Sequence, residues 1–268
     1  MPSFAPSGVI TITTDFGHKG PFVGVMKGVI AGRFPGATVI DVTHDIPAHW
    51  PPEAGFWMSR AWRWFPPGSV HVGVVDPGVG TERDILLATL GGHLFIAPDN
   101  GLLAPLLPQA DSIRRLDPGV LDRLGLPPPS ATFHGRDIFA PVAAELAAGR
   151  LQPQALGDAV EDWTPGWLDE PACTPGRVAG VIVTIDAFGN LISNIDASLI
   201  GDFVRAEVQL AGHRLALSPT YGRVTPGDYL ALINSFDVIE VARAEGDAAA
   251  GLGTGRGAPL VVVDRGRA

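Results

Sequence analysis

The pattern of hydrophobic and polar residues near the amino terminus predicts a strand, a helix and a second strand. Residues 9–14 (VITITT) alternate as a strand does, and residues 22–30 place apolar side chains at positions i, i+3, i+4, i+7 and i+8, which is helical spacing. Pro35-Gly36 ends the helix, and residues 38–42 (TVIDV) are predicted as the next strand. This strand, helix, strand order is typical of an α/β sheet.

A second helical stripe covers residues 54–65 and ends at Pro66-Pro67. We expect Trp57 and Trp62, which lie on this stripe, to belong to the core rather than to a surface on which a ligand stacks. The strands predicted after it are residues 70–75, 85–90 and 93–96, the last two forming a hairpin around Gly91-Gly92. The first part of the chain, residues 1–150, is therefore predicted to be an α/β domain with a mostly parallel sheet.

The second part of the chain has a different pattern. Residues 151–176 have no clear period and are rich in proline, glycine and acids, so we predict a linker there. Beyond it, short alternating segments with turn residues between them predict a small barrel or sandwich over residues 177–268. The predicted strands are residues 177–185, 203–210, 214–217, 229–233, 238–242 and 259–263.

Composition narrows the class of protein. The chain of 268 residues is 46% hydrophobic, enough for sizeable cores. Its formal net charge of −9 argues against nucleic acid or an anionic membrane surface as a partner, because binding phosphates requires basic patches. The single cysteine, Cys173, excludes an internal disulfide and a cysteine-rich zinc site. No apolar run has the length of a membrane span and the start of the chain lacks a signal-peptide layout, so we expect a cytoplasmic protein.

Two acids follow predicted strands, at the strand end where open α/β sheets bind their ligands. Asp15 follows residues 9–14, and Asp76 follows residues 70–75. The loop after Asp76 is punctuated by proline and glycine, and Arg83 lies seven residues beyond Asp76, where the loop could fold it back onto the carboxylate. From the pattern alone, this pair could equally serve only to tie the loop together.

A candidate histidine precedes another predicted helix. His134 stands directly before a segment whose apolar side includes Ile138, Val142 and Leu146. A histidine at a helix start is usually a cap or core residue, but together with two acids at strand ends it becomes a candidate for proton transfer. The polar residues that we expect at loop positions are Asp15, Asp76, Arg83, His134, Asp186, Asn190, Asn194 and Ser235.

Several common catalytic and binding motifs are absent from the sequence. There is no Gly-x-Gly-x-x-Gly fingerprint after the first strand, no phosphate-binding Gly-Lys-Ser/Thr loop, no His-Glu-x-x-His and no Gly-x-Ser-x-Gly. His44-Asp45 is expected to be structural rather than to bind a metal. The residues alone therefore indicate an enzyme that acts on a small molecule by acid–base chemistry.

Seven segments together carry a resemblance to a known family. They are TTDFGHKGPFVGVMKG (13–28), THDIP (43–47), FPPGSVHVGVVDPGVGTERD (65–84), PDNG (98–101), TFHGRDIFAP (132–141), DAFGNLISNI (186–195) and INSFDVIEVA (233–242). In this order, they resemble the S-adenosyl-L-methionine (SAM) hydroxide adenosyltransferases, the hydrolase branch of a family that includes adenosyl-fluoride and adenosyl-chloride synthases. The resemblance implies an α/β domain followed by a β-barrel, and a homotrimer whose active sites lie between one subunit's first domain and a neighbour's second.

The resemblance also implies roles for individual residues. Asp76, Arg83 and His134 match the group that activates water, and no cofactor or metal is expected, because SAM is the substrate. The first domain would also supply Asp15 to the ribose hydroxyls, Phe133 to the adenosyl pocket and Trp50 to the wall around the ribose. The barrel would supply Asn190, Arg243 and the stacking Tyr221 near the adenine, and Asp186 and Ser235 to the methionine amino and carboxylate groups.

Two residues depart from the pattern of the halogenating relatives. Gly20 stands where they, and many of the hydrolases, have an acid, and Phe236 stands where they have an arginine, so methionine would be anchored more weakly or in a different way here. The short loop between Arg83 and Pro98 leaves no room for the insertion typical of the halogenating branch.

The expected reaction is attack of water on the ribose C5′ of SAM, giving adenosine and L-methionine. Asp76 and His134 would hold and deprotonate the water, and Arg83 would keep Asp76 ionised or stabilise hydroxide directly. The alternatives are a SAM or adenosine sensor without turnover, a hydrolase of another adenosyl substrate, and a halide transferase.

Overall fold

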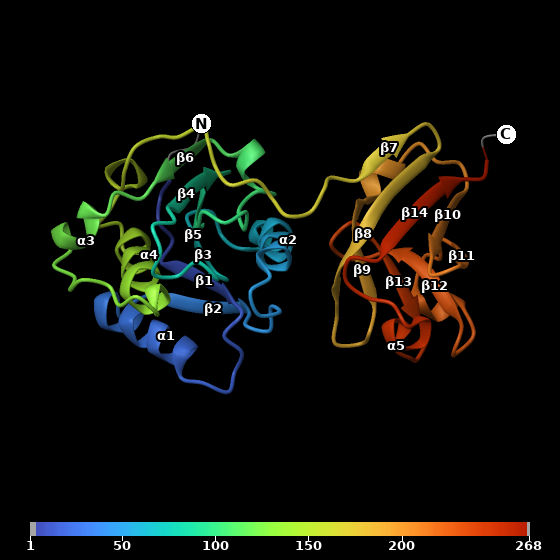
Figure 1. Ribbon diagram of the computed structural model, residues 1–268, viewed down its shortest axis with the longest axis horizontal. Helices are drawn as coiled ribbons and strands as arrows, with labels where there is room; N and C mark the ends of the chain where they lie inside the picture. Colours follow the sequence, from blue (N-terminus) through green and yellow to red (C-terminus); the bar gives the residue numbers. More distant parts are fainter. Residues whose placement is uncertain (1–3, 267–268) are drawn as a thin grey trace. The chain divides into compact units, whose positions relative to one another are not determined.

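The computed structural model describes residues 4–266, and the chain forms two compact units (Figure 1). The boundary between the units lies between Trp167 and Leu168. Within the described residues, no helix is both long and apolar enough to cross a membrane.

The first unit is built on a six-stranded sheet with strand order β2-β1-β3-β5-β4-β6. Strands β2, β1, β3 and β5 run parallel to one another, and β4 is antiparallel to both β5 and β6. The strands are β1 (Val9–Thr14), β2 (Thr38–Thr43), β3 (Val70–Val74), β4 (Ile85–Leu90), β5 (His93–Pro98) and β6 (Ser112–Arg115). The predicted hairpin around Gly91-Gly92 is confirmed, and both glycines have positive φ, as a tight two-residue turn requires.

Helices cover both faces of this sheet (Figure 1). On one face, α1 (Phe22–Arg33) and α4 (Ala140–Ala147) pack on the side of β5 that carries Leu94 and Ile96. On the other face, α2 (Pro51–Ala61) packs with Phe95 and Ala97 of the same strand. The alternation of β5 between two separate cores explains why all its residues are buried. The shorter elements are η1 (Trp62–Trp64), η2 (Leu107–Gln109), α3 (Gly119–Arg123), η3 (a π-helix, Gly135–Phe139) and η4 (Pro153–Ala155).

Two details of the predicted helices need correction. In α1 the buried face runs through Val23, Met26 and Ile30, whereas Phe22 is 47% exposed. The second helix ends at Ala61, four residues earlier than predicted, because the chain tightens into the 3₁₀ turn η1. Trp57 and Trp62 pack against the core on the α2 side of the sheet, as predicted.

Two buried histidines lie on that same side of the sheet. His71 of β3 is 2% exposed and His93 of β5 is 3% exposed, and their Nε2 and Nδ1 atoms are 3.1 Å apart. His71 Nδ1 is also 2.8 Å from Thr11 Oγ1, and the His71 ring stacks on Phe95 with centroids 4.8 Å apart. Burial, followed by the charge of His93, lowers the pKa of His71 to about 3, so both rings are neutral at neutral pH.

The second unit is a nearly closed antiparallel barrel with strand order β11-β10-β14-β8-β9-β13-β12. A bridge between Leu217 and Ala231 links the two ends of this order, and β7 pairs with β8 at the side. The strands are β7 (Ala172–Thr174), β8 (Arg177–Ile185), β9 (Leu191–Asp196), β10 (Ala206–Leu210), β11 (His213–Ala216), β12 (Tyr229–Ile233), β13 (Val238–Arg243) and β14 (Pro259–Asp264), with η5 (Ala197–Ile200), η6 (Tyr221–Arg223) and α5 (Ala248–Leu252) between them. The α/β sheet and the barrel confirm the fold class predicted from the sequence.

Strand β9 was not predicted from the sequence, and Asn194 was therefore wrongly expected in a loop. This residue lies within β9 rather than in a loop. Its Oδ1 accepts a hydrogen bond from Val181 N at 2.8 Å, and its Nδ2 donates to Asp169 O at 3.1 Å. Asn194 therefore joins backbone segments of the barrel and has a structural role.

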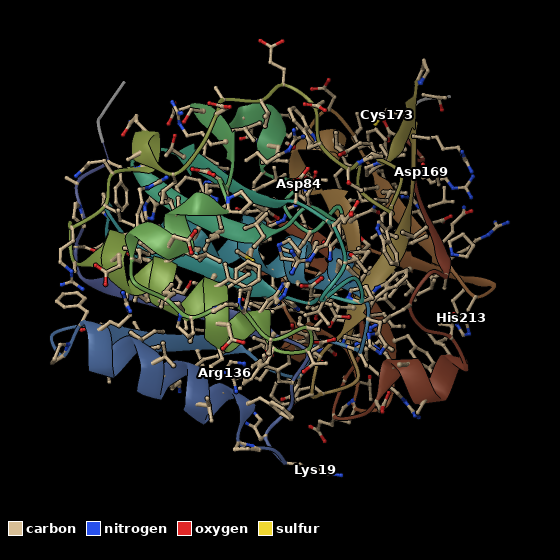
Figure 2. All side chains as sticks on the ribbon, turned by 60° about the vertical axis from the view of Figure 1, so that its left-hand side comes forward. Lys19, Asp84, Arg136, Asp169, Cys173 and His213 are labelled. Atoms are coloured by element: carbon tan, nitrogen blue, oxygen red, sulfur yellow. The ribbon has the colours of Figure 1, made fainter. Side chains whose placement is uncertain are left out.

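The segment predicted to be a linker, residues 151–176, contains both η4 and β7. Within it, Trp163 packs against the core on the α2 side of the first unit, and Cys173 lies exposed in β7 of the second unit (Figure 2).

Candidate active site

The two predicted strand-end acids lie at the same edge of the sheet. Asp15 directly follows β1, and Asp76 follows β3 by two residues. These strands are parallel neighbours whose last paired residues are Thr14 and Val74, so their carboxyl ends meet. Asn100 Nδ2 donates to Val75 O at 2.8 Å and holds the backbone just before Asp76.

The loop after Asp76 turns back on itself and presents Arg83 to the carboxylate. Gly80 has φ +78°, and a Cβ there would lie 2.2 Å from Ala131 O, so only glycine permits this close approach. Arg83 Nε donates to Asp76 Oδ1 at 2.7 Å and to Oδ2 at 2.9 Å, and Arg83 Nη2 also donates to Oδ2. The Asp76 side chain is 4% exposed and that of Arg83 10%, so the pair is shielded from water.

The same guanidinium reaches His134. Arg83 Nη2 lies 2.8 Å from His134 Nδ1. Because a guanidinium has no acceptor, Nδ1 must accept, and the neutral imidazole carries its proton on Nε2. Burial, and then the Arg83 cation, lower the pKa of His134 and keep the ring neutral, although Asp76 and Asp137 oppose this. Arg83 is thus the central member of a chain that runs from Asp76 to His134.

An ion pair fixes the segment that carries His134. Asp137 Oδ2 accepts from Ser130 N at 2.9 Å and from Ser130 Oγ at 2.6 Å, and Oδ1 accepts from Arg136 Nε at 2.6 Å. Arg136, labelled in Figure 2, also lies over the Phe133 ring at 5.2 Å. These bonds lower the pKa of Asp137 to about 2, so its carboxylate stays charged and closes the segment between Ser130 and Asp137.

Four predicted site residues of the first unit line one cavity of about 290 Å³. They are Asp15, Asp76, Phe133 and His134. Phe16 and His49 also line it, and no pattern in the sequence pointed to them. His49 N donates to Asp15 Oδ2 at 3.0 Å and so orients that carboxylate. The remaining lining residues are Ala48, Val74, Val79, Thr132 and Gly135.

Trp50 is not among the residues that line this cavity, although Ala48 and His49 just before it are. It immediately precedes α2, and its ring meets Trp167 edge to face, with centroids 5.7 Å apart. Trp167 Nε1 in turn donates to Asn100 O at 2.9 Å. The contacts of Trp50 therefore join it to the segment around Asn100.

His44 and Asp45 do not gather a set of metal ligands. His44 Nδ1 is 2.8 Å from Thr14 Oγ1, and its Nε2 is 3.0 Å from Asp41 Oδ1. Among residues 4–266, no group of three or more histidine, cysteine, aspartate or glutamate side chains is arranged to hold a metal ion. His44 thus links the ends of β1 and β2.

Four predicted residues of the second unit line a separate cavity of about 480 Å³. They are Asp186, Asn190, Tyr221 and Arg243. Phe188 also lines it and is 78% exposed. The other lining residues are Ala244, Glu245 and Gly246.

Hydrogen bonds fix the polar residues of this second cavity. Asp186 Oδ1 accepts from the backbone N of Phe188 and of Asn190, both at 2.9 Å. Asp186 Oδ2 accepts from Asn190 Nδ2 at 2.9 Å, which leaves Asn190 Oδ1 as the end of the amide that faces other partners. Arg243 Nε donates to Gly227 O at 3.0 Å. The charged groups of this cavity thus hold their own loops in shape.

Ser235 is exposed in the turn between β12 and β13, outside the residues that line the second cavity. Glu240 of β13 was not among the predicted site residues; it is 2% exposed and accepts a hydrogen bond from Tyr221 OH at 2.7 Å. Its position as the only acid within the apolar run VIEVA could have identified it in the sequence. A carboxylate is buried in a strand only where hydrogen-bond donors satisfy it.

Comparisons with known proteins agree with this architecture. Residues 10–157 match the SAM hydroxide adenosyltransferase N-terminal domain, and residues 180–261 match the C-terminal domain of the same family. A protein of Thermus thermophilus named (R)-S-adenosyl-L-methionine hydrolase is 38% identical over 92% of this chain and 96% of its own length.

A more distant relative and a crystal structure agree with these matches. A fluorinase of an Actinoplanes species is 29% identical over 88% of this chain and 90% of its own length. The crystal structure of an uncharacterized conserved protein from Thermotoga maritima covers 95% of this chain and 99% of its own, with a TM-score of 0.85 at 32% identity. The two domain matches and these similarities over most of the chain show that it belongs to the SAM hydroxide adenosyltransferase family.

Proposed function

We propose that this protein hydrolyses SAM to adenosine and L-methionine, with water attacking ribose C5′ in line with the departing sulfur. The observation that carries the proposal is the hydrogen-bonded chain of Asp76, Arg83 and His134, which borders a cavity that also contains Asp15. The name of the Thermus thermophilus relative supports the same substrate and the same type of reaction.

The chemistry of this reaction places its demands on the nucleophile. The water oxygen forms a bond to C5′ while the C5′–S bond breaks. The electron pair of the C5′–S bond stays on sulfur and converts the sulfonium into the neutral thioether of methionine. The leaving group therefore needs no proton. The water must lose one, and a positioned base typically accelerates such a step by about 10²–10⁴-fold.

The geometry favours Asp76 over His134 as the group that takes this proton. His134 Nδ1 already accepts from Arg83, so the neutral ring offers an N–H at Nε2 rather than a lone pair. Asp76 is held by Arg83, yet each carboxylate oxygen can accept more than one hydrogen bond. In this proposal Arg83 keeps Asp76 ionised, His134 orients the water through Nε2–H, and Asp76 accepts the proton before releasing it to solvent.

We propose that the remaining residues bind the substrate. Asp15, whose Oδ2 is oriented by His49 N, binds the ribose hydroxyls, and Phe133 packs on the adenosyl group. The residues of the second unit bind the two ends of SAM: Asn190, Arg243 and Tyr221 near the adenine, Asp186 and Ser235 at the methionine. Trp50, which directly follows the lining residue His49, is proposed to stand near the ribose.

We further propose that the protein is a homotrimer with its sites at subunit interfaces, as its family resemblance implies. Sedimentation velocity of the full chain tests this directly. A single species with three times the chain mass is expected, and a species that remains monomeric at all concentrations would contradict it.

Product analysis in isotopically labelled water tests the reaction. The full chain is incubated with SAM in H₂¹⁸O, with and without chloride, and the products are separated by chromatography and weighed by mass spectrometry. We expect methionine and adenosine, with ¹⁸O in the adenosine 5′-hydroxyl, because attack at C5′ places the water oxygen there.

Each other outcome selects a different function. Formation of 5′-chloroadenosine in chloride would identify a halide transferase. Saturable SAM binding without product would identify a sensor, and turnover of another adenosyl compound but not SAM would identify a different hydrolase.

A further inference from the structure

The barrel buries one carboxylate whose position is not explained by packing. Ile239 and Val241 of β13 point into the barrel core, so Glu240 between them points to the outer face. There it is 2% exposed and pairs across the sheet with Leu232 of β12. A carboxylate placed there costs free energy unless donors replace its lost water.

Two neutral side chains supply those donors. Tyr221 OH donates to Glu240 Oε1 at 2.7 Å, and Asn234 Nδ2 donates to Oε2 at 3.1 Å. Burial, and secondarily the charge of Asp186, raise the pKa of Glu240, whereas these two hydrogen bonds oppose the rise. Glu240 is thus an energetically unfavourable acid at a buried position where both side chains donate to it.

The first of these hydrogen bonds fixes an aromatic wall of the cavity. Tyr221 begins η6, is 45% exposed and lines the second cavity rather than the barrel core. Further along the same segment, Val224 packs on the outer face of the barrel. Val224 anchors the segment, and the hydroxyl bond to Glu240 is what sets the angle of the Tyr221 ring.

The second hydrogen bond fixes the turn between β12 and β13. Because Asn234 Nδ2 donates to Glu240, Asn234 Oδ1 points back to the turn and accepts from Phe236 N at 3.0 Å and from Val238 N at 3.4 Å. This turn presents Ser235. Glu240 therefore sets the orientation of the amide that shapes the turn.

We infer that Glu240 is a positioning residue for the substrate, which holds the Tyr221 ring and the Ser235 turn in place at the same time. The inference rests on the proposed function, in which Tyr221 faces the adenine and Ser235 the methionine. One buried acid would then hold the surfaces for both ends of SAM in a fixed relation, with no contact to the substrate itself.

Two substitutions at Glu240 separate positioning from stability. Glu240→Leu fills the same space but removes both acceptors, and we expect about a tenfold increase in the Kd for adenosine and in the KM for SAM. The kcat should change by less than about threefold, because the catalytic chain of the first unit is untouched. Glu240→Gln should restore near-normal values, since its oxygen can accept from Asn234 while its amide donates to the Tyr221 hydroxyl.

Substitutions of the two partners test each hydrogen bond separately and do not require Glu240→Leu to fold. Tyr221→Phe keeps the ring but loses the bond, and should weaken adenosine binding about threefold or more. Asn234→Asp keeps the oxygen that caps the turn but places a second charge against Glu240. It should raise the KM for SAM while changing the Kd for adenosine much less.

The matched control is Glu145→Leu. Glu145 is 7% exposed, pairs with Arg33 and Arg150 in the first unit, and lines neither cavity. It should lower the melting temperature without changing KM or the Kd for adenosine.

The outcomes separate this inference from the proposed function. If Glu240→Leu lowers stability as Glu145→Leu does but keeps wild-type KM and Kd, Glu240 is only structural and the inference is wrong. Wild-type affinities in both Tyr221→Phe and Asn234→Asp would overturn it equally. A wild-type protein that neither binds adenosine nor cleaves SAM would instead overturn the proposed function.

Discussion

The cavities of the two units use their charged side chains in opposite ways. In the first unit, Arg83 joins Asp76 to His134, residues that come from different segments of the chain. In the second unit, Asp186 bonds to its own turn, and Arg243 donates to a backbone carbonyl. Beside the first cavity, Arg83 thus links two other side chains of the site to each other, whereas the charged groups of the second cavity hold their own loops in shape.

This difference indicates that the first cavity serves chemistry and the second serves recognition of the ligand. Linked charges beside a small cavity can hold an ionised base next to a bound water, which chemistry at a carbon centre requires. Charges that rigidify loops instead leave an aromatic ring and amide groups to contact a ligand, which serves recognition. Substitutions in the chain of Asp76, Arg83 and His134 should therefore change rates, and those in the second unit should change affinities.

The largest expected effect is on the proposed base. Asp76→Asn should lower kcat by about 10²–10⁴-fold, because it removes the proton acceptor but keeps the size of the side chain. The Kd for adenosine should change little, as measured by calorimetry. Asp84→Asn is the control, since Asp84 is a half-exposed neighbour whose side chain pairs with Arg115 (Figure 2). Equal losses of kcat and adenosine affinity in Asp76→Asn would break the division between the two cavities.

The second effect concerns the stability of the first unit. Arg83→Leu would leave the Asp76 carboxylate buried without its cation, at a cost of about 3 kcal/mol in the free energy of unfolding. All six tryptophans lie before the unit boundary, so urea unfolding followed by tryptophan emission reports on the first unit. Arg83→Lys is the comparison, because it keeps the charge but not the bidentate geometry. Unchanged unfolding in Arg83→Leu would mean that water already solvates Asp76.

The sequence predicted that Asp15 and Asp76 lie at one edge of the sheet because local rules and topology agree there. Alternation identified β1 and β3, and the parallel arrangement of such strands brings Asp15 and Asp76 to one edge. The return of Arg83 to Asp76 was foreseeable from a loop of proline and glycine. Its bond to His134, 51 residues further on, depends on tertiary packing, and so does the tautomer that follows from it.

The barrel was harder to predict where its interior is polar. Strand β9 was missed because Ser193 interrupts its inward-facing row, between Leu191 and Ile195. Ser193 is fully buried and donates from Oγ to Ile239 O at 2.8 Å, so a hydroxyl is satisfied where the pattern requires an apolar residue. The partners of Glu240, Tyr221 of η6 and Asn234 of the turn between β12 and β13, likewise leave no periodic pattern, so only its position within an apolar run marks it.

A third prediction sharpens the comparison within the first cavity. Asp15→Ala should raise the Kd for adenosine on the order of 10- to 100-fold, because it removes charged hydrogen bonds to the ribose, while the fold survives. Calorimetry measures the affinity, and tryptophan emission verifies the fold. The exposed acid Asp45 supplies the control variant, Asp45→Ala, which should bind as the wild type does. Adenosine binding that is indifferent to Asp15→Ala would remove Asp15 from the site.

The smallest expected effect distinguishes the units by their response to mild acid. His71 and His93 are buried and neutral in the first unit, whereas the only histidine after the unit boundary, His213, is exposed (Figure 2). The pKa of His71 falls from 6.5 to about 3 on folding, so below pH 6.5 the unfolded chain binds a proton that the folded one excludes.

Stability of the first unit should therefore fall by about 1 kcal/mol between pH 7 and pH 5.5, a range above that in which ordinary carboxylates titrate. In the second unit the raised pKa of Glu240 acts with the opposite sign, because the folded state then binds the proton more readily. Urea unfolding at both pH values, followed by tryptophan emission, measures the loss in the first unit. His71→Leu should weaken that dependence, of which His93 and His134 retain a part because their pKa values are also lowered, whereas His213→Leu should leave it intact. If the stability of the wild-type first unit does not change between the two pH values, the buried histidines gain protons without opening the core. Acid sensitivity would then not distinguish the two units.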